Sequence, residues 1–264
     1  MVKREITIRI AAPVFLLFLF TSLLYSCKND ELKTGAVVFS FDDQYVDLWY
    51  KQRELFNKYN IKATFFINRP QLLQPEQIKK LKELEADGHE IGCHGLNHVN
   101  SLNYKDSIDV LIESDIKPAI EILKNYGFDV VSFAYPYGSS TPEIDSALLH
   151  HFQYLRKATW NMQDTSINTY NEIFATKTNF RINNAMGIDT NYKITLENLE
   201  TGLARANKLD EVLVVYAHRI DTTLRDYSIH PKYLEDAFKL CNKNKIQSIR
   251  YRDMNDFLST KNHK

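Results

Sequence analysis

Short apolar runs alternate with amphipathic segments along most of this chain. Continuous apolar runs of this length are typical of strands that are buried on both faces of a parallel sheet. The predicted strands, in chain order, are Val37–Phe41, Ala63–Ile67, Glu90–Cys93, Val130–Tyr135, Tyr154–Trp160, Val212–Ala217 and Gln247–Arg250.

The segments between these strands carry apolar residues at helical spacing. Proline in the first turn marks three of the helix starts, and glycine marks two of the ends. The predicted helices are Val46–Tyr59, Pro75–Leu84, Tyr104–Tyr126, one that begins at Thr141, Ile194–Leu209, Pro231–Cys241 and Met254–Leu258.

The segment 161–192 is polar and weakly patterned, so we expect loops there, with a short strand near Phe180–Ile182. Elsewhere the alternation of strand and helix predicts an α/β fold. Its parallel sheet is either open or closed into a barrel.

The N-terminal segment has a different pattern. Lys3, Arg4 and Arg9 precede an apolar run from Ala11 to Tyr25. This run is shorter than the roughly 20 residues of a spanning helix and is typical of a signal peptide. It ends in Leu24-Tyr25-Ser26-Cys27, which resembles the lipobox of bacterial lipoproteins.

That resemblance implies that Cys27 becomes the lipidated first residue of the processed chain. We therefore predict a lipoprotein signal peptide over 1–26, a polar tether over 27–34 and one domain over 35–264. The expected location is the cell envelope, on a bacterial membrane, facing the periplasm or the cell surface. An uncleaved anchor and an ordinary secretory signal are the alternatives.

The charge balance and the cysteine content limit the binding partners and the disulfides that the chain can have. The chain has 33 basic and 33 acidic residues and no polybasic run, which argues against nucleic acid as a partner. Membrane contact is expected only through the N-terminal lipid. Cys93 and Cys241 could pair in an oxidising compartment, although the apolar surroundings of Cys93 favour a small core residue.

Chemical groups follow several of the predicted strands. Asp42 and Asp43 end the first strand, His94 follows the third with His98 four residues on, and His218 follows the most apolar strand. In a parallel barrel these ends share one mouth. Because successive strand residues point to opposite faces, the two aspartates are expected to have different partners.

Taken alone, each of these features has a simpler explanation. An Asp-Asp pair after a strand usually forms a solvated turn or a helix cap. Two histidines four apart on one helical turn can reach one ion, but the spacing by itself is common. Together with Asp43, the two imidazoles would form three ligands with open positions, as a catalytic metal requires.

The sequence resembles the polysaccharide deacetylases, the NodB-type domain of carbohydrate esterase family 4, through most of the region after the N-terminal segment. The motifs that carry the resemblance occur in the family's order and are Phe41-Asp42-Asp43, His94-Gly95-Leu96-Asn97-His98, Pro136-Tyr137-Gly138 and the final His218. The resemblance implies a distorted (β/α)7 barrel.

It also implies the chemistry of the site. Asp43, His94 and His98 would hold one divalent metal ion, with Zn²⁺ expected and Co²⁺ or Ni²⁺ as alternatives. Asp42 would be the catalytic base and His218 the general acid. The remaining motif, Pro136-Tyr137-Gly138, would add the Tyr137 backbone N–H to an oxyanion hole.

The implied activity is hydrolysis of N-acetyl groups on a polysaccharide or oligosaccharide that contains N-acetylhexosamine. An esterase for O-acetyl groups, as on xylan, and a catalytically impaired glycan-binding protein remain as alternatives. The sequence leaves the oligomeric state open.

Three family features are missing at their usual places. The first motif usually ends in Gly, and here that position is Gln44. The third motif usually begins with an Arg that pairs with the base, and here that position is Ala134. Arg156 or Arg181 could supply the guanidinium from a neighbouring strand, or both could be structural. The fourth motif, an Asp and a Trp near the acid His, has only Trp160 and Asp164 as candidates.

Aromatic side chains near these motifs could stack on sugar rings. The candidates are Tyr45, Trp49, Tyr135 and Trp160. In an apolar-rich chain, packing in the core is the favoured role for such residues.

Overall fold

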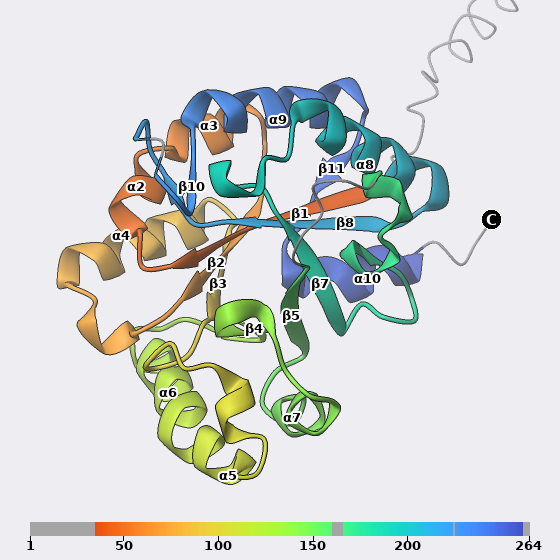
Figure 1. Ribbon diagram of the computed structural model, residues 1–264. Helices are drawn as coiled ribbons and strands as arrows, with labels where there is room; N and C mark the ends of the chain where they lie inside the picture. Colours follow the sequence, from red (N-terminus) through yellow and green to blue (C-terminus); the bar gives the residue numbers. More distant parts are fainter. Residues whose placement is uncertain (1–34, 160–165, 224, 261–264) are drawn as a thin grey trace, which may run out of the picture. The chain divides into compact units, whose positions relative to one another are not determined.

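The structure is a computed structural model that describes residues 35–159, 166–223 and 225–260 (Figure 1). These residues belong to one unit of the chain, Lys33–Lys264. The predicted signal peptide and the tether, with Cys27, lie outside the described residues. So do Trp160 and Asp164.

Seven parallel strands form a ring in which each strand pairs with the next. In order around the ring they are β1 (Ala36–Asp43), β2 (Ala63–Ile67), β3 (Glu90–Cys93), β4 (Ser132–Ala134), β5 (Tyr154–Thr159), β7 (Ile182–Gly187) and β8 (Val212–Ala217). The ring closes because β8 pairs with β1 as well as with β7. Its weakest junction is β3–β4, where Cys93 opposite Phe133 is the one registered pair. The predicted distorted (β/α)7 barrel is confirmed.

Four short strands lie outside this ring. They are β6 (Phe174–Ala175), which pairs antiparallel with β8, β11 (Gln247–Ser248), which pairs with β1, and the separate pair β9 (Arg219–Ile220) and β10 (Ser228–Ile229).

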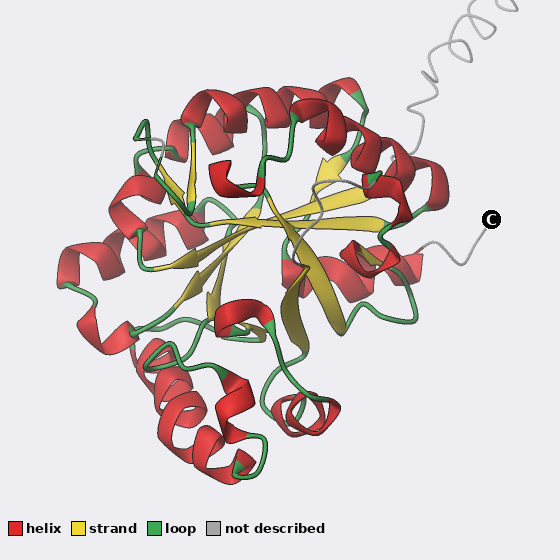
Figure 2. Cartoon of the chain, in the orientation of Figure 1, coloured by secondary structure: helices red, strands yellow, loops and turns green. Residues whose placement is uncertain are grey.

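Helices surround the strands (Figure 2). They are α2 (Val46–Tyr50), α3 (Arg53–Lys58), α4 (Pro75–Ala86), α5 (Ile108–Leu111), α6 (Lys117–Asn125), α7 (Pro142–Leu148), α8 (Leu196–Leu209), α9 (Pro231–Lys243) and α10 (Met254–Ser259). Among the described residues, no helix combines the length and the apolar character that crossing a bilayer would require.

Two predicted helices are interrupted. The segment predicted as one helix over Val46–Tyr59 forms α2 and α3. The long helix predicted over Tyr104–Tyr126 contains a π-helical turn, Ile112–Ile116, between α5 and α6. π-helical turns of this kind are frequently found at functional sites.

The short strand expected near Phe180–Ile182 corresponds to β7, which begins at Ile182 and continues to Gly187 as a full strand of the barrel, where loops were predicted. Its sequence contains Asn183 and Asn184, which removes the apolar pattern expected of a buried strand. Asn183 is nevertheless buried, because its side chain accepts from the Tyr251 hydroxyl at 3.0 Å and donates to the Phe180 carbonyl at 3.2 Å. Internal hydrogen bonds therefore allow a polar residue inside the barrel.

An aromatic cluster fixes the end of β1 that carries the two aspartates. The rings of Phe41 and Phe65 stack with centroids 5.5 Å apart, and Trp49 of α2 stacks on Phe65 at 5.1 Å. The Trp49 indole N–H also donates to the backbone carbonyl of His218 at 2.7 Å. Trp49 is fully buried and therefore packs in the core, as the sequence favoured. Cys93 is also in the core as a free thiol, so the possible disulfide with Cys241 is not formed.

Candidate active site

The three predicted metal ligands lie together at the C-terminal ends of β1 and β3. One potential ligand atom from each of Asp43, His94 and His98 lies within 4.8 Å of the other two. His98 Nε2 is 3.3 Å from Asp43 Oδ1, and His94 Nε2 is 3.9 Å from the same oxygen. Asn68 donates to that oxygen at 2.8 Å and fixes the carboxylate.

The two histidines are not on a helical turn, as the four-residue spacing had suggested. They lie on a loop after β3 in which Gly95 has φ 83° and His98 has φ 59°. This left-handed backbone turns the chain back, so that both imidazoles face Asp43.

The surroundings of His94 define its tautomer. Its Nδ1 is 2.7 Å from the Ala134 carbonyl oxygen, which can only accept, so Nδ1 carries the proton. Nε2 then has a free lone pair on the side of Asp43. Burial lowers the pKa of His94 to about 4, so the ring is neutral near pH 7. Partial burial also lowers the pKa of His98, against the opposing charge of Asp43.

This donor set fits a divalent ion. Two neutral imidazole nitrogens and one carboxylate oxygen are ligands typical of a catalytic zinc site with open positions. The hydrogen bonds of His94 to Ala134 and of Asn68 to Asp43 are the outer contacts that such a site needs.

A buried carboxylate holds the loop that carries His98. Asp115, in the π-helical turn, accepts from the Asn97 backbone N–H at 2.7 Å. Its other oxygen, Oδ2, would be only 2.5 Å from a Cβ atom built on Gly95. A side chain at position 95 would therefore displace the carboxylate. We infer that Asp115 positions the loop between the two histidines.

Asp42 has a different partner from Asp43 and is almost fully buried. Its Oδ2 accepts from Arg156 Nη2, while Oδ1 is buried without a partner among the described residues. Burial raises the pKa of Asp42, but the Arg156 guanidinium and the nearby His94 and His218 outweigh it and hold that pKa below its usual value. The carboxylate is therefore ionised near pH 7.

The missing guanidinium of the third motif is thus supplied by Arg156. Ala134 of β4 is paired in register with Arg156 of β5, and side chains opposite each other in a sheet share a face. The arginine consequently reaches the same space from the neighbouring strand. Arg181, the other candidate, is exposed and donates to the Gln153 carbonyl at 3.2 Å.

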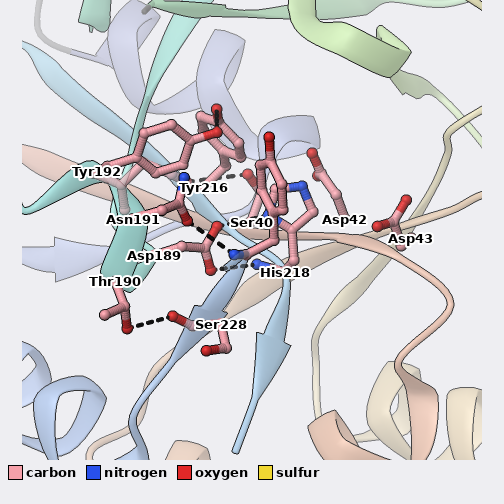
Figure 3. Close-up of polar contacts among 12 residues, drawn as sticks. Ser40, Asp42, Asp43, Asp189, Thr190, Asn191, Tyr192, Tyr216, His218 and Ser228 are labelled. Carbon is pink, nitrogen blue, oxygen red and sulfur yellow. Dashed lines mark hydrogen bonds and ion pairs between the residues drawn. The ribbon is translucent and has the colours of Figure 1, made fainter. Parts of the chain in front are cut away.

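His218 follows β8 and is held by an aspartate that the sequence analysis did not single out. Asp189 Oδ2 is 2.6 Å from His218 Nδ1, and Asp189 Oδ1 accepts from the His218 backbone N–H at 3.0 Å (Figure 3). Burial lowers the pKa of His218, but the hydrogen bond and charge of Asp189 outweigh it, so the pKa is raised. The only signal for Asp189 is its place after β7, which the sequence pattern concealed.

One pocket of about 220 Å³ connects these groups. Its lining includes Asp42, Asp43, His94, His98, Arg156 and His218, together with six tyrosines, Tyr45, Tyr135, Tyr137, Tyr192, Tyr216 and Tyr227. Tyr137 has φ 62°, and its half-exposed ring lies 5.0 Å from the His98 ring. Every described residue for which we predicted a metal or catalytic role therefore borders the same cavity.

The comparisons with known proteins agree with this arrangement. Residues 29–155 match the sequence model of the polysaccharide deacetylase family. Among curated proteins, the chain is 27% identical over 119 residues to the putative polysaccharide deacetylase YheN of Bacillus subtilis (strain 168), which is 45% of this chain and 40% of that protein. It is 28% identical over 113 residues to a gellan lyase of a Bacillus species, which is 42% of this chain and 4% of that protein. The chain thus spans less than half the length of these relatives.

Solved structures show the same fold. The Xyl-CE4 domain of a multidomain xylanase from the hindgut metagenome of Trinervitermes trinervoides aligns with a TM-score of 0.54 and 13% identity, over 84% of this chain and 90% of that one. Peptidoglycan deacetylase PdaC from Bacillus subtilis aligns with a TM-score of 0.53 and 14% identity, over 86% and 92%.

The barrel and the site define a NodB-type α/β domain. Over residues 29–155, slightly less than half of the chain, the sequence is that of a polysaccharide deacetylase domain, and the described barrel has the fold of the carbohydrate esterase family 4 structures. The matched region 29–155 contains the three candidate ligands, Asp42 and Tyr137, whereas Arg156, Asp189 and His218 follow it.

Replacing Arg156 by Met should leave the Asp42 carboxylate buried without a counter-charge. Breaking a buried ion pair in this way typically costs about 3–5 kcal/mol of folding free energy. The double variant Asp42→Asn/Arg156→Met removes both charges and should recover part of that loss. Urea unfolding of the three proteins checks this, and a double variant no more stable than Arg156→Met would contradict it.

Replacing Asp115 by Ala should weaken metal binding, because the loop of His98 loses its anchor. Loss of an outer contact of this kind typically costs about 10–100-fold in metal affinity. Competition for Zn²⁺ with a chromophoric chelator measures the affinity. Asp109→Ala, an exposed acidic residue of the neighbouring α5, is the control. Equal affinities for both variants would rule out the positioning role.

Proposed function

We propose that this protein is a metal-dependent hydrolase that removes N-acetyl groups from a polysaccharide or oligosaccharide containing N-acetylhexosamine. The observation that carries the proposal is the convergence on one small pocket of a three-ligand set, an ionised buried carboxylate and a histidine that its aspartate keeps basic. Metal-assisted amide hydrolysis requires each of these three elements.

A divalent ion held by Asp43, His94 and His98 would polarise the acetyl carbonyl and lower the pKa of the attacking water from 15.7 towards roughly 7. We propose Zn²⁺ as this ion, with Co²⁺ or Ni²⁺ as alternatives. The donor set supports a borderline-soft divalent cation.

The residues of this chain then divide the proton transfers. Asp42 takes a proton from the water as its oxygen attacks the carbonyl carbon. The Tyr137 backbone N–H donates to the oxygen that becomes negative. His218 gives its proton to the nitrogen as the carbon–nitrogen bond breaks, which releases acetate and the free amine.

The state of His218 favours an amide substrate. An amine is a poor leaving group unless it is protonated, and the Asp189 carboxylate raises the pKa of His218, which favours the protonated form that can donate. An O-acetyl esterase remains the second candidate, since a xylanase domain and a peptidoglycan deacetylase share this fold.

The third candidate, an impaired glycan-binding protein, loses its main support. It rested on the missing arginine at Ala134 and on the unclear fourth motif. Arg156 contacts the base, and Asp189 holds the acid, so both functions have a residue in this chain.

Acetate release tests the proposal directly. The full chain should release acetate from N-acetylated chitooligosaccharides faster than from acetylated xylan, and EDTA should abolish both. His218→Ala should reduce hydrolysis of the amide more than that of an activated ester, because only the amine needs the proton. His150→Ala, an exposed histidine, is the control. Turnover that survives complete metal removal would refute the metal role, and preference for acetylated xylan would favour the esterase.

The pH dependence should reveal the Asp189–His218 pair. Because His218 must be protonated, kcat/KM on the amide should fall as pH rises through the raised pKa of His218. Asp189→Asn removes the charge that raises this pKa, so the fall of kcat/KM on the alkaline side of the pH profile (its descending limb) should move to lower pH. A limb that stays in place in this variant would assign it to another group.

A further inference from the structure

We propose that Tyr227 forms the aromatic wall of a sugar subsite beside His218, which binds the pyranose ring that leaves with the nitrogen. This inference rests on the proposed function, because it adds the recognition of the leaving sugar to the chemistry above. The sequence analysis did not include Tyr227 among the aromatic residues that could stack on sugars.

The first observation is the exposure of the ring. Tyr137 and Tyr227 are the two described pocket residues whose large apolar side chains are classed as exposed, at 54% and 47%. The candidates chosen from the sequence differ, since Trp49 and Tyr135 are buried in the core. An apolar surface left open at the mouth of a polar pocket is typical of a ligand site.

The second observation is that the backbone of Tyr227 is held in an unusual conformation. Its φ is 56°, in the left-handed region that a bulky residue rarely adopts. The Asn191 side chain accepts from its backbone N–H at 2.9 Å, and Thr190 donates to the carbonyl of the next residue, Ser228, at 2.8 Å. Such conformations persist where the surrounding structure imposes them, and they cluster at functional sites.

The third observation is where this places the ring. Its centroid is 5.1 Å from that of His218 at an interplanar angle of 74°, and 6.4 Å from that of Tyr192 at 76°. Tyr192 in turn accepts from the Tyr216 hydroxyl at 2.7 Å. Near-perpendicular packing on two fixed rings leaves Tyr227 rigid, so a ligand that stacks on it loses little side-chain freedom.

A single turn connects this wall to the acid. Four consecutive residues, Asp189 to Tyr192, bind in order the His218 ring, the backbone of Ser228, the backbone of Tyr227 and the hydroxyl of Tyr216. Figure 3 shows the contacts of Asp189 with His218 and of Thr190 with Ser228. The turn therefore sets the acid and the aromatic surface in one fixed relation. A sugar stacked on the exposed part of Tyr227 would therefore lie beside the imidazole that we propose as the proton donor.

The leaving group that fits this surface is a pyranose. The ring of a β-linked hexosamine offers a face of C–H bonds that packs on an aromatic ring, while its hydroxyls remain in the open mouth. Binding energy from this ring would position the acetamide for attack, so its loss should affect reactions of the sugar substrate most.

The test compares Tyr227→Ala with Tyr227→Phe, which keeps the ring, in the full chain. Binding of tetra-N-acetylchitotetraose is measured by calorimetry with EDTA present to prevent turnover. Its Kd should rise about 3- to 10-fold in Tyr227→Ala and less than about 2-fold in Tyr227→Phe. Leu209→Ala, an exposed apolar residue outside this pocket, is the matched control.

Kinetics add a second readout. With metal present, the ratio of kcat/KM for the tetrasaccharide to kcat/KM for 4-nitroacetanilide, an amide without a sugar, should fall about 3- to 10-fold in Tyr227→Ala. An equal loss on both substrates would mean that Tyr227 only supports His218, which overturns the subsite.

The binding measurement also separates the two proposals. If the native chain releases no acetate but binds the tetrasaccharide through Tyr227, the proposed activity fails and the subsite stands. An unchanged Kd in Tyr227→Ala, or no binding of the tetrasaccharide by the native chain, overturns the subsite whatever the activity.

Discussion

The ion pair between Asp42 and Arg156 is the interaction on which the site depends. It joins β1 to β5 across the barrel, with both side chains almost fully buried. A charge taken out of water is costly unless a partner and hydrogen bonds compensate for it. The guanidinium also lies 4.7 Å from the Tyr216 ring centroid and 5.5 Å from that of Phe66, so two aromatic rings add cation–π contacts to the ion pair.

Because of this ion pair, the adjacent residues Asp42 and Asp43 have different surroundings. Because Asp42 faces the barrel and Asp43 faces the histidines, one carboxylate keeps a buried oxygen free of partners while the other meets the candidate metal ligands. Two histidines of the pocket are also set apart by their surroundings. Burial keeps His94 neutral, whereas the Asp189 carboxylate keeps His218 basic. Opposite pKa shifts of two histidines within one cavity allow them to have different roles in acid–base chemistry.

Much of the fold could be read from the sequence. The bounds of β2, β3 and β8 were predicted to the residue, because buried parallel strands are continuous apolar runs. The candidate site residues that directly follow such runs, among them Asp42, His94 and His218, could be selected from the sequence for the same reason. Of the strand β7, only the start near Ile182 was expected, since Asn183 is buried through hydrogen bonds that only the folded barrel supplies.

The supporting residues needed tertiary information. Arg156 was one of two candidates, and the register of β4 against β5 distinguishes it from Arg181. Asp189 follows the strand that the pattern concealed. Asp115 lies in a predicted helix, where a single acidic residue gives no hint that it faces a loop more than ten residues earlier in the chain.

The π-helical turn at Ile112–Ile116 has an evolutionary consequence. Such a turn contains one residue more than the α-helix that would span the same length, and it is the form that a one-residue insertion into a helix takes. Deleting that residue would restore a regular helix. The part of the helix on one side of the deletion would then be rotated relative to the other part by about a quarter turn or more. The carboxylate of Asp115 would then leave the loop of His98, so the length of this segment is as constrained as the identity of residue 115.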